Sequence, residues 1–311
     1  MKNRDPKVKT EIERFNKQFY GSFDVDYFLQ KCFYLVALLS KPEEVSNILK
    51  QGVGFKSLKM QLSEDDDTEM LKTEKLQRNL KAEIATTYFH AIETLFRIIF
   101  AHARTTDCPW VELTINNNFK KFKKDVEKFT KHEYFKVDHM QGLTLIFYGR
   151  VDKPDGVTKA VWGKSLKNIS DFLDNFGSDL QQSYAYNSYK HGLAMFSEEF
   201  GFSLGSIIKV DKEDALVFLS FDDDKEQPDY KQLHRNYVFT KWEQKWALVY
   251  QLTHMLDNVM KIGNWQYNKG DYSVKLFDKL DLLSVIKSGD NPIQPSTVSE
   301  SSFSFKMGRS K

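Results

Sequence analysis

Apolar positions along the chain recur mainly at helical spacing, which predicts a mainly α protein. Proline, glycine and capping residues mark the ends of the periodic segments. The predicted helices cover residues 6–20, 25–39, a short stretch from Pro42, 70–104, 119–131, a stretch from Lys164 to Gly177, 178–199 and 230–262. We expect a multi-helix bundle that forms a single domain over residues 1–287. Residues 288–311 are rich in serine and lack apolar spacing, which predicts a flexible tail.

Two regions favour strands instead. Residues 143–151 (LTLIFYGRV) are rich in β-branched and aromatic side chains, and the turn-forming string Lys153-Pro-Asp-Gly follows them. The apolar strings at 206–210 and 215–221 flank four polar residues, which favours a small β-hairpin. We therefore expect β excursions near residues 143–163 and 205–222.

Composition limits the class of protein. The 311 residues are 41% hydrophobic and 28% charged, so the chain can bury a core and general disorder is excluded. The formal net charge of +2 gives no overall attraction to nucleic acid or to an anionic membrane. The longest uncharged apolar run, residues 32–39, is far shorter than the ~20 residues that span a bilayer. We expect a cytoplasmic protein that does not associate with membranes.

The sequence predicts no metal or cofactor. Two cysteines, Cys32 and Cys108, cannot form a disulfide framework or a multi-cysteine zinc site. The aspartate runs at 65–67 and 222–224 lack the alternating ligands of a calcium loop. The chain also lacks the strings HExxH, GxGxxG, GxSxG and Walker A, which argues against zinc proteases, common serine hydrolases and ATP-driven chemistry.

A polar stripe follows the long helix predicted over residues 70–104. At about 100° per residue, Glu83, His90 and Arg97 fall on one side of this helix. A stripe of this kind is also what the solvent side of an amphipathic helix shows, so both interpretations stay open.

A second polar set lies in the helix predicted over residues 178–199. Asn187 and His191 share a face with apolar residues, and Lys190 flanks it. If that face points to the core, its polar groups need partners, because an unpaired buried group costs roughly 1–3 kcal/mol. Glu83 is the expected carboxylate for Lys190. The cluster could hold a phosphate and transfer protons; alternatively it faces solvent, or only sets the register of two helices.

The helical character and the string Arg97-Ile-Ile-Phe-Ala-His102 resemble the HEPN superfamily. Many HEPN members are metal-independent ribonucleases of toxin and antiviral-defence systems, with an arginine and a histidine separated by four to six residues. In that family the pair lies across a dimer interface, and the histidine assists attack by the ribose 2′-hydroxyl. On an ideal helix a spacing of five separates Arg97 and His102 by roughly 140°, so a kink would be needed to bring them together.

Carried over residue by residue, the resemblance names Arg97 and His102, and the RNA-directed hypothesis built on it adds Asn187, Lys190 and His191. Arg97 and Lys190 would hold phosphate, His102 or His191 would act as acid and base, and Asn187 would orient the substrate. Glu83 and His90 would support this site.

Residues 118–132 (NFKKFKKDVEKFTKH) carry the clearest local charge. Four apolar residues recur at three- and four-residue steps and form one seam, while lysines occupy the rest of the helix. The lysines expected to contact RNA or DNA phosphates, or an acidic protein surface, are Lys120, Lys121, Lys123 and Lys124. The alternative is a solvated helix that is packed by its phenylalanines.

Three functions are therefore compatible with the sequence. The first is a HEPN-type protein that binds or cleaves RNA, with RNA or a second copy as partner. The second is a non-enzymatic module that binds a protein or a nucleic acid and whose polar cluster is structural. The third is a small-ligand pocket between helices.

Overall fold

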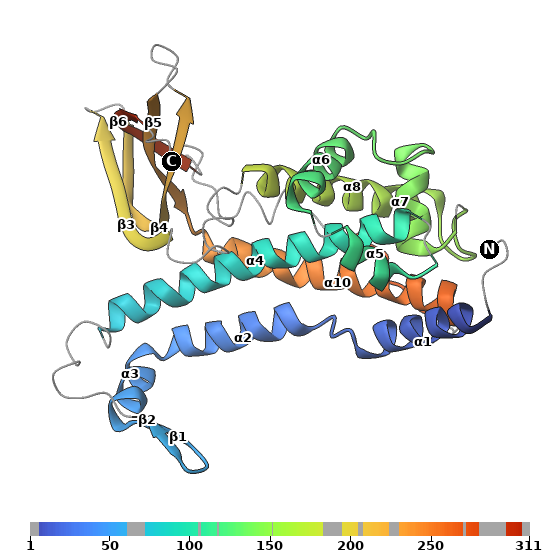
Figure 1. Cartoon of the computed structure of the whole chain (residues 1–311), viewed down its shortest axis with the longest axis horizontal. Helices are drawn as coiled ribbons and strands as arrows, with labels where there is room; N and C mark the ends of the chain where they lie inside the picture. The colour runs from blue at the N-terminus through green and yellow to red at the C-terminus, as the bar shows by residue number, and fades with distance from the viewer. Residues whose placement is uncertain are drawn as a thin grey trace. The chain divides into compact units, whose positions relative to one another are not determined.

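The computed structural model describes residues 6–60, 72–104, 107–116, 118–150, 152–182, 195–204, 208–223, 230–269, 272–279 and 297–306. The protein is mainly helical and carries a small antiparallel sheet, as predicted (Figure 1). Its helices are α1 (Pro6–Ser22), α2 (Tyr27–Ser40), α3 (Pro42–Gln51), α4 (Thr73–Ala103), α5 (Pro109–Ile115), α6 (Phe119–Thr130), α7 (His139–Tyr148), α8 (Lys159–Gln182) and α10 (Trp242–Asn268). Its strands are β1 (Val53–Phe55), β2 (Leu58–Met60), β3 (Met195–Leu204), β4 (Ile208–Asp223), β5 (Tyr230–Phe239) and β6 (Thr297–Lys306).

The chain divides into two compact units. The first comprises Met1–Leu29, Tyr88–Gln182 and Ala247–Ile286, and the second comprises Gln30–Thr87, Ser183–Trp246 and Lys287–Lys311. The boundaries after Leu29, Thr87 and Trp246 fall inside the continuous helices α2, α4 and α10. The single domain expected over residues 1–287 stays a prediction.

The first unit has an aromatic core between its helices. Phe96 of α4 and Phe129 of α6 are fully buried, with ring centroids 5.3 Å apart in an edge-to-face arrangement. Helix α6 packs closely on α8 at Gly177, where an added methyl group would overlap Cγ2 of Thr130. The Thr130 hydroxyl also accepts a hydrogen bond from Gln181 at 3.1 Å. This close approach fixes α6 against α8.

An extended segment, residues 272–279, is tied to α8 and α10 by side chains that bind its backbone. The fully buried Asn258 donates to the carbonyl oxygen of Lys275 at 2.8 Å and accepts from its amide at 3.0 Å. The hydroxyl of Ser165 accepts from the amide of Phe277 at 2.7 Å. These bonds satisfy backbone groups that would otherwise be buried without partners.

The second unit contains an antiparallel sheet with the strand order β3-β4-β5-β6. Alternate residues of β4 and β5 form an apolar cluster on one face, because strand side chains alternate with a period of two. Its members are Ala215, Val217, Tyr237 and Phe239, with Phe200 of β3 packed against them. Asp214 of β4 is bound by Lys81 of α4 at 2.6 Å, which ties the sheet to that helix.

Most of the predicted helices are confirmed. Helices α1, α2, α3, α4 and α6 occupy the predicted segments to within about three residues at each end. Gly52 follows α3 as its C-cap and adopts a positive φ of 89°. The turn expected at residues 153–156 is also present, with Gly156 at a φ of 77°.

The strand predicted at residues 143–151 is wrong, because residues 143–148 belong to α7. The side chain of Asp138 caps the helix by accepting a hydrogen bond from the amide of Gln141 at 3.2 Å. Gly149 ends it in the left-handed conformation, with a φ of 67°. Burial of most of the helix surface gives a continuous apolar run, which looks like a buried strand in sequence. The β excursion expected near 143–163 is therefore absent from its described residues, where α7 and the start of α8 are found.

The helix boundaries predicted at residues 177–178 and at residue 199 are also wrong. Helix α8 continues through Gly177 and Ser178, because that glycine serves close packing and not helix termination. The helix expected to reach residue 199 is replaced by β3 from Met195 onward. Residues 183–194 lie outside the described residues.

The β region near 205–222 is confirmed but its hairpin differs. Residues 211–214 do not turn; they belong to the continuous strand β4, which pairs with β3 on one side and β5 on the other. The helix predicted over residues 230–262 begins only at Trp242, and the first ten residues form β5. Within the predicted flexible tail, Thr297–Lys306 forms strand β6, which pairs antiparallel with β5.

Candidate functional site

Arg97 lies on the part of α4 that belongs to the first unit, and two groups hold its side chain. Its Nε atom donates to Oε1 of Glu93 at 2.7 Å, and the Glu93 side chain is only 5% exposed. Its guanidinium lies over the Phe122 ring, 4.4 Å from the centroid. A buried carboxylate needs a nearby cation. Arg97 therefore neutralises Glu93 and packs α4 on α6.

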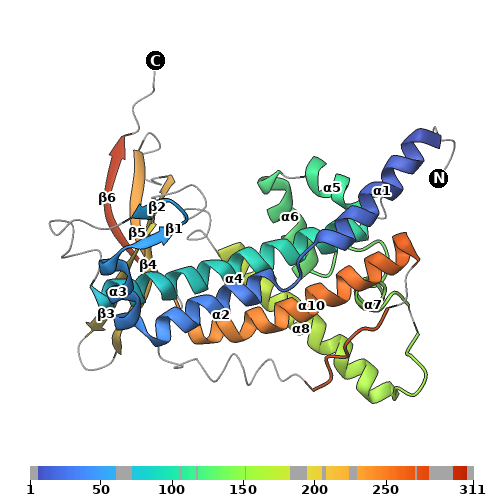
Figure 2. The ribbon, with the colours of Figure 1, turned by 90° about the horizontal axis from the view of Figure 1, so that it is seen from below.

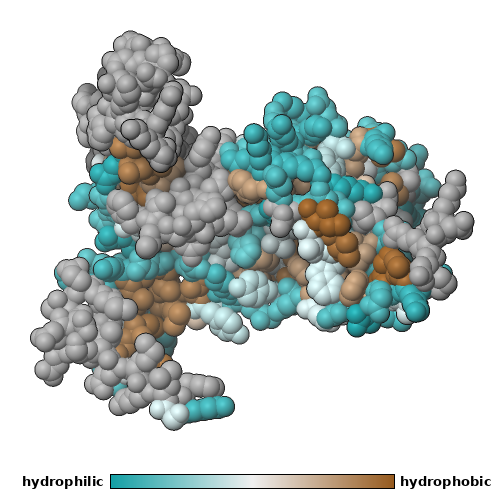
Figure 3. Space-filling model, viewed as in Figure 1, coloured by the Kyte–Doolittle hydropathy of each residue, from teal (hydrophilic) through white to brown (hydrophobic). Residues whose placement is uncertain are grey.

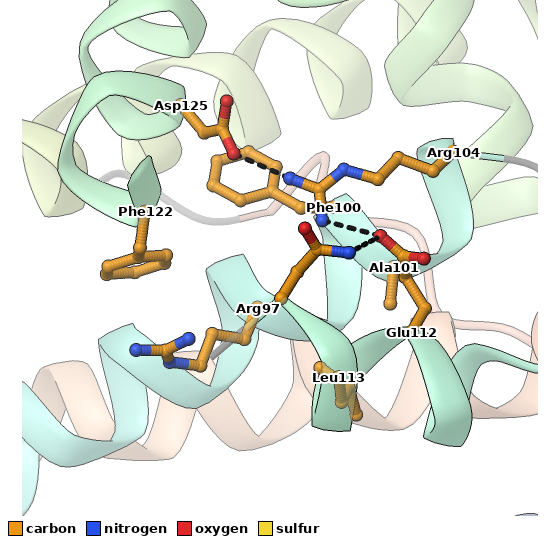
Figure 4. A pocket seen from close by; sticks show the side chains of 9 residues that line it. Arg97, Phe100, Ala101, Arg104, Glu112, Leu113, Phe122 and Asp125 are labelled. Atoms are coloured by element: carbon orange, nitrogen blue, oxygen red, sulfur yellow. Dashed lines mark hydrogen bonds and ion pairs between the residues drawn. The ribbon is translucent and has the colours of Figure 1, made fainter. Parts of the chain in front are cut away.

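A small polar hollow lies beside Arg97, where α4, α5 and α6 meet (Figure 4). Arg104 joins the three helices, because it donates to Glu112 at 2.9 Å and to Asp125 at 2.5 Å. In Figure 4 the Arg97 side chain extends away from these groups, toward Phe122. The lining residues include two arginines and two carboxylates, so their formal charges cancel. The hollow is thus better suited to joining helices than to binding an anion.

His102 is buried where α1, α4 and α10 come together (Figure 2). Its Nδ1 atom lies 2.7 Å from the carbonyl oxygen of Ile98, and its Nε2 atom lies 2.7 Å from the Tyr20 hydroxyl. A carbonyl oxygen only accepts, so Nδ1 carries the proton and Nε2 accepts from Tyr20. Burial lowers the pKa of His102 to about 4, although the bond to Ile98 opposes this. His102 is therefore neutral at pH 7, with both nitrogens bonded.

The structure does not bring Arg97 and His102 together. Arg97 faces α6, whereas His102 faces Tyr20 of α1 and Gly263 of α10, as their positions on an ideal helix imply. The catalytic roles implied for the two residues stay predictions.

The other predicted residues of α4 also have separate surroundings. In the second unit, Glu83 accepts a hydrogen bond from Lys31 of α2 at 2.5 Å. The pairing of Glu83 with Lys190 stays a prediction. In the first unit, His90 is exposed and its ring lies edge-to-face with Phe28, 5.1 Å between centroids. Asn187, Lys190 and His191 lie outside the described residues, and their predicted roles stay predictions.

Helix α6 forms as its sequence predicts. The Asn118 side chain caps it by accepting from the amide of Lys121 at 3.1 Å. The predicted apolar seam is buried, with Phe122, Val126 and Phe129 each at most 4% exposed. An N-cap and a buried seam together fix the helix, so the side chains on its opposite side project from a rigid support.

The side of α6 opposite the seam is rich in lysines. At about 100° per residue, five lysines fall within an arc of about 100° on this side, and the exposed Glu127 lies at the edge of the arc. All are exposed, and Figure 3 shows hydrophilic residues gathered over α6. We call the following set the lysine face: Lys120, Lys121, Lys124, Lys128 and Lys131.

Members of the lysine face differ in their contacts. Lys121 donates to the Asn116 side chain, and Lys131 pairs with Glu127 at 2.7 Å. The other three, Lys120, Lys124 and Lys128, form no ion pair with any residue that the structure describes. They recur every four residues and so stand in a row along one side of α6.

Lys123, which the sequence interpretation grouped with these lysines, belongs to another side of the helix. Its ammonium group lies 5.5 Å from the centre of the Phe119 ring. Burial lowers its pKa, which is consistent with a side chain that lies along the apolar surface. Lys128 and Lys131, by contrast, lie on the exposed side of the helix together with Lys120, Lys121 and Lys124.

The sequence interpretation missed a histidine pair at the end of the lysine face. His132 follows α6, and its ring stacks on that of His139 with centroids 4.0 Å apart and planes at 17°. Its Nε2 atom lies 3.1 Å from Oδ2 of Asp174, which comes from α8. The spacing of seven between the histidines was a visible signal, but nothing in the sequence pointed to an aspartate 42 residues away from His132.

No protein-family model, curated protein or solved structure matches this chain. The resemblance to the HEPN superfamily therefore stays a prediction. Within the described ranges, no helix is long and apolar enough to cross a membrane, and no group of three or more histidine, cysteine, aspartate or glutamate side chains is placed to hold a metal ion.

Proposed function

We propose that this chain binds the phosphate backbone of RNA through the lysine face of α6. The observation that carries the proposal is the row of Lys120, Lys124 and Lys128. These three ammonium groups are exposed and have no ion-pair partner among the described residues. Phosphate contacts of this kind supply affinity without reading base sequence.

The local charge supports this proposal more than the overall charge does. Helix α6 carries five lysines against one aspartate and one glutamate, a formal charge of +3 in a chain whose net charge is +2. Both acidic residues already have partners, since Asp125 binds Arg104 and Glu127 binds Lys131. The positive charge of the row is therefore not cancelled from within the helix.

The length of the row suits a nucleic-acid strand. Eight residues separate Lys120 from Lys128, which corresponds to about 12 Å along the helix at ~1.5 Å per residue. Phosphates follow one another at ~3.4 Å along the axis for each strand of a duplex, so the row can reach roughly three or four of them. A flexible single strand can adjust its spacing to the lysines.

The proposal requires neither Arg97 nor His102. The first neutralises Glu93, and the second has both ring nitrogens bonded inside the core. Binding by α6 is also compatible with the non-enzymatic module that the sequence allowed as an alternative. The RNA-binding measurement below distinguishes RNA from an acidic protein as the partner of α6.

The test is fluorescence anisotropy with a labelled single-stranded RNA of 12 to 15 nucleotides of mixed sequence, at about 50 mM salt. Replacing Lys120, Lys124 and Lys128 by glutamine removes three charges from the row without changing the buried seam. We expect the dissociation constant to rise at least tenfold, because two to three phosphate contacts are lost.

A matched control removes the same charge elsewhere. Lys9 and Lys17 of α1 and Lys164 of α8 are exposed lysines of the first unit, and their replacement by glutamine gives the same net charge as the test variant. We expect this control to bind within about twofold of the wild type. Equal weakening by both triple variants, or no RNA binding by the wild type, would contradict the proposal and leave an acidic protein surface as the partner to examine.

A further inference from the structure

His132 follows the lysine face in the chain, and two contacts hold its ring. Its Nε2 atom is 3.1 Å from the Asp174 carboxylate, and one side of the ring stacks on His139 at 4.0 Å. Its backbone adopts the left-handed conformation, with a φ of 60°, and its amide donates to the carbonyl oxygen of Phe129 at 2.9 Å, which ends α6. The side chain is 49% exposed, so solvent or a ligand can reach it.

The groups behind His132 have unused hydrogen-bonding capacity. His139 is 6% exposed, and neither of its ring nitrogens has a partner among the described residues. Oδ1 of Asp174 is likewise buried without a partner there. Burial raises the pKa of Asp174, and burial together with the neighbouring His132 lowers the pKa of His139 to about 4. Buried polar atoms without partners are unusual in a purely structural cluster.

The carboxylate determines which nitrogen of His132 is basic. Asp174 can only accept a hydrogen bond when ionised, so it holds the neutral ring with the proton on Nε2. The lone pair is then on Nδ1, which forms no hydrogen bond with a described residue. A base oriented by a third group in this way is the usual arrangement for proton transfer in catalysis.

We infer that His132 is a general base that cleaves RNA bound on the lysine face, with Asp174 and His139 as its positioning residues. This inference rests on the proposed function, because the lysine face must first hold the phosphodiester. An ordinary exposed ion pair would not need the ring stack on His139. The stack, together with the unpartnered buried atoms of His139 and Asp174, is what distinguishes this site.

The reaction is a transesterification within the RNA. Nδ1 of His132 removes the proton of a ribose 2′-hydroxyl while the 2′ oxygen attacks the adjacent phosphorus. The bond from phosphorus to the 5′ oxygen breaks, and that oxygen takes a proton from water. The protonated His132 then returns its proton to the hydroxide, so the products are a 2′,3′-cyclic phosphate and a 5′-hydroxyl. Lysines of the face stabilise the additional negative charge on the phosphoryl oxygens.

The experiment incubates the full chain with the same labelled RNA in EDTA at pH 7 and identifies the products by electrophoresis and mass. We expect fragments that end in a cyclic phosphate, and no cleavage of a DNA strand of the same sequence, which lacks the 2′-hydroxyl. His132→Asn should slow cleavage about a hundredfold or more, the usual loss when a general base is removed. Asparagine tolerates the left-handed conformation, so this variant should fold.

Two further variants distinguish chemistry from structure. His132→Gly suits the backbone conformation, and added imidazole should restore part of its cleavage. Asp174→Asn should change the pH profile of cleavage, since the ring then loses the carboxylate that fixes its tautomer. RNA affinity, measured by anisotropy, should stay within twofold of the wild type in all three variants.

The outcomes separate this inference from the proposed function. Wild-type protein that binds RNA but leaves it intact over several hours would refute the catalytic role of His132 and leave the binding function in place. Equal cleavage by the wild type and His132→Asn would also refute it. Failure of the wild type to bind RNA would overturn both.

Discussion

Acidification should destabilise this protein through His102. The ring is neutral in the folded state because burial lowers its pKa from 6.5 to about 4. In the unfolded chain the same ring titrates near its ordinary value. Between these two values the unfolded state binds more protons than the folded state, so stability is lost as the pH falls through this window.

The size of the effect follows from the two pKa values of His102, 6.5 and about 4. Linkage gives a loss of about 2 kcal/mol in the free energy of unfolding between pH 7 and pH 5. The effect should level off below pH 4, where both states are protonated. Since the Tyr20 hydroxyl donates to Nε2, protonation would also break that hydrogen bond.

The assay is urea unfolding followed by circular dichroism at pH 7, 6, 5 and 4.5, for the wild type and for His102→Gln. Glutamine can accept the hydrogen bond from Tyr20 but does not titrate. The variant should be less stable than the wild type at pH 7, and its stability should change less with pH, by about 2 kcal/mol over the same interval. Parallel pH dependence of the two proteins would refute a buried, neutral His102.

Three further changes test the packing around the proposed sites. Gly177→Ala should cost about 1–3 kcal/mol of stability, because the added methyl group overlaps Cγ2 of Thr130. Adding Thr130→Ser to this variant removes that methyl group and should restore most of the lost stability. Losses that simply add in thermal unfolding would contradict the predicted overlap. Asn258→Ala should cost about 2 kcal/mol of stability and raise the amide hydrogen-exchange rates of residues 272–279, because the two bonds to the Lys275 backbone are lost. Unchanged exchange rates in these residues would show that Asn258 does not hold the segment. Arg104→Met should cost about 2–3 kcal/mol of stability at pH 7, because the carboxylates of Glu112 and Asp125 lose their cation. A variant as stable as the wild type would show that solvent already screens these two charges.

The sequence predicted the long helices well because their signals are local. Residues 73–103 and 119–130 show clear apolar spacing, and both segments form helices. The same spacing predicted the exposed lysines of α6. Lys123 differs from them, because its ammonium group lies 5.5 Å from the centre of the Phe119 ring.

The errors arose where tertiary contacts determine the local structure. The apolar string at 143–148 is helical because the helix is buried on most sides, and a buried helix has no polar face that would reveal its period. Gly177 lies inside α8 because Thr130 of α6 approaches it closely. Neither contact could be anticipated from residues nearby in the sequence.

The same distinction applies to the candidate site. The lysines could be predicted from the sequence because they lie on a single helix. The contact between His132 and Asp174 joins two helices, and so do the bonds that Arg104 makes with its carboxylates. Pairs of this kind depend on how helices pack, which the apolar period alone does not specify.

The salt dependence of RNA binding tests the central claim most directly. If three to five lysines of α6 contact phosphates, log K should fall linearly with log salt with a slope of about −2 to −3.5, at ~0.7 per contact for a single strand. A slope of −3 weakens binding roughly 60-fold between 50 and 200 mM salt. Replacing Lys120, Lys124 and Lys128 by glutamine should reduce the slope by about 2. An affinity that does not change with salt, or a slope that the three substitutions leave unaltered, would contradict RNA binding by α6.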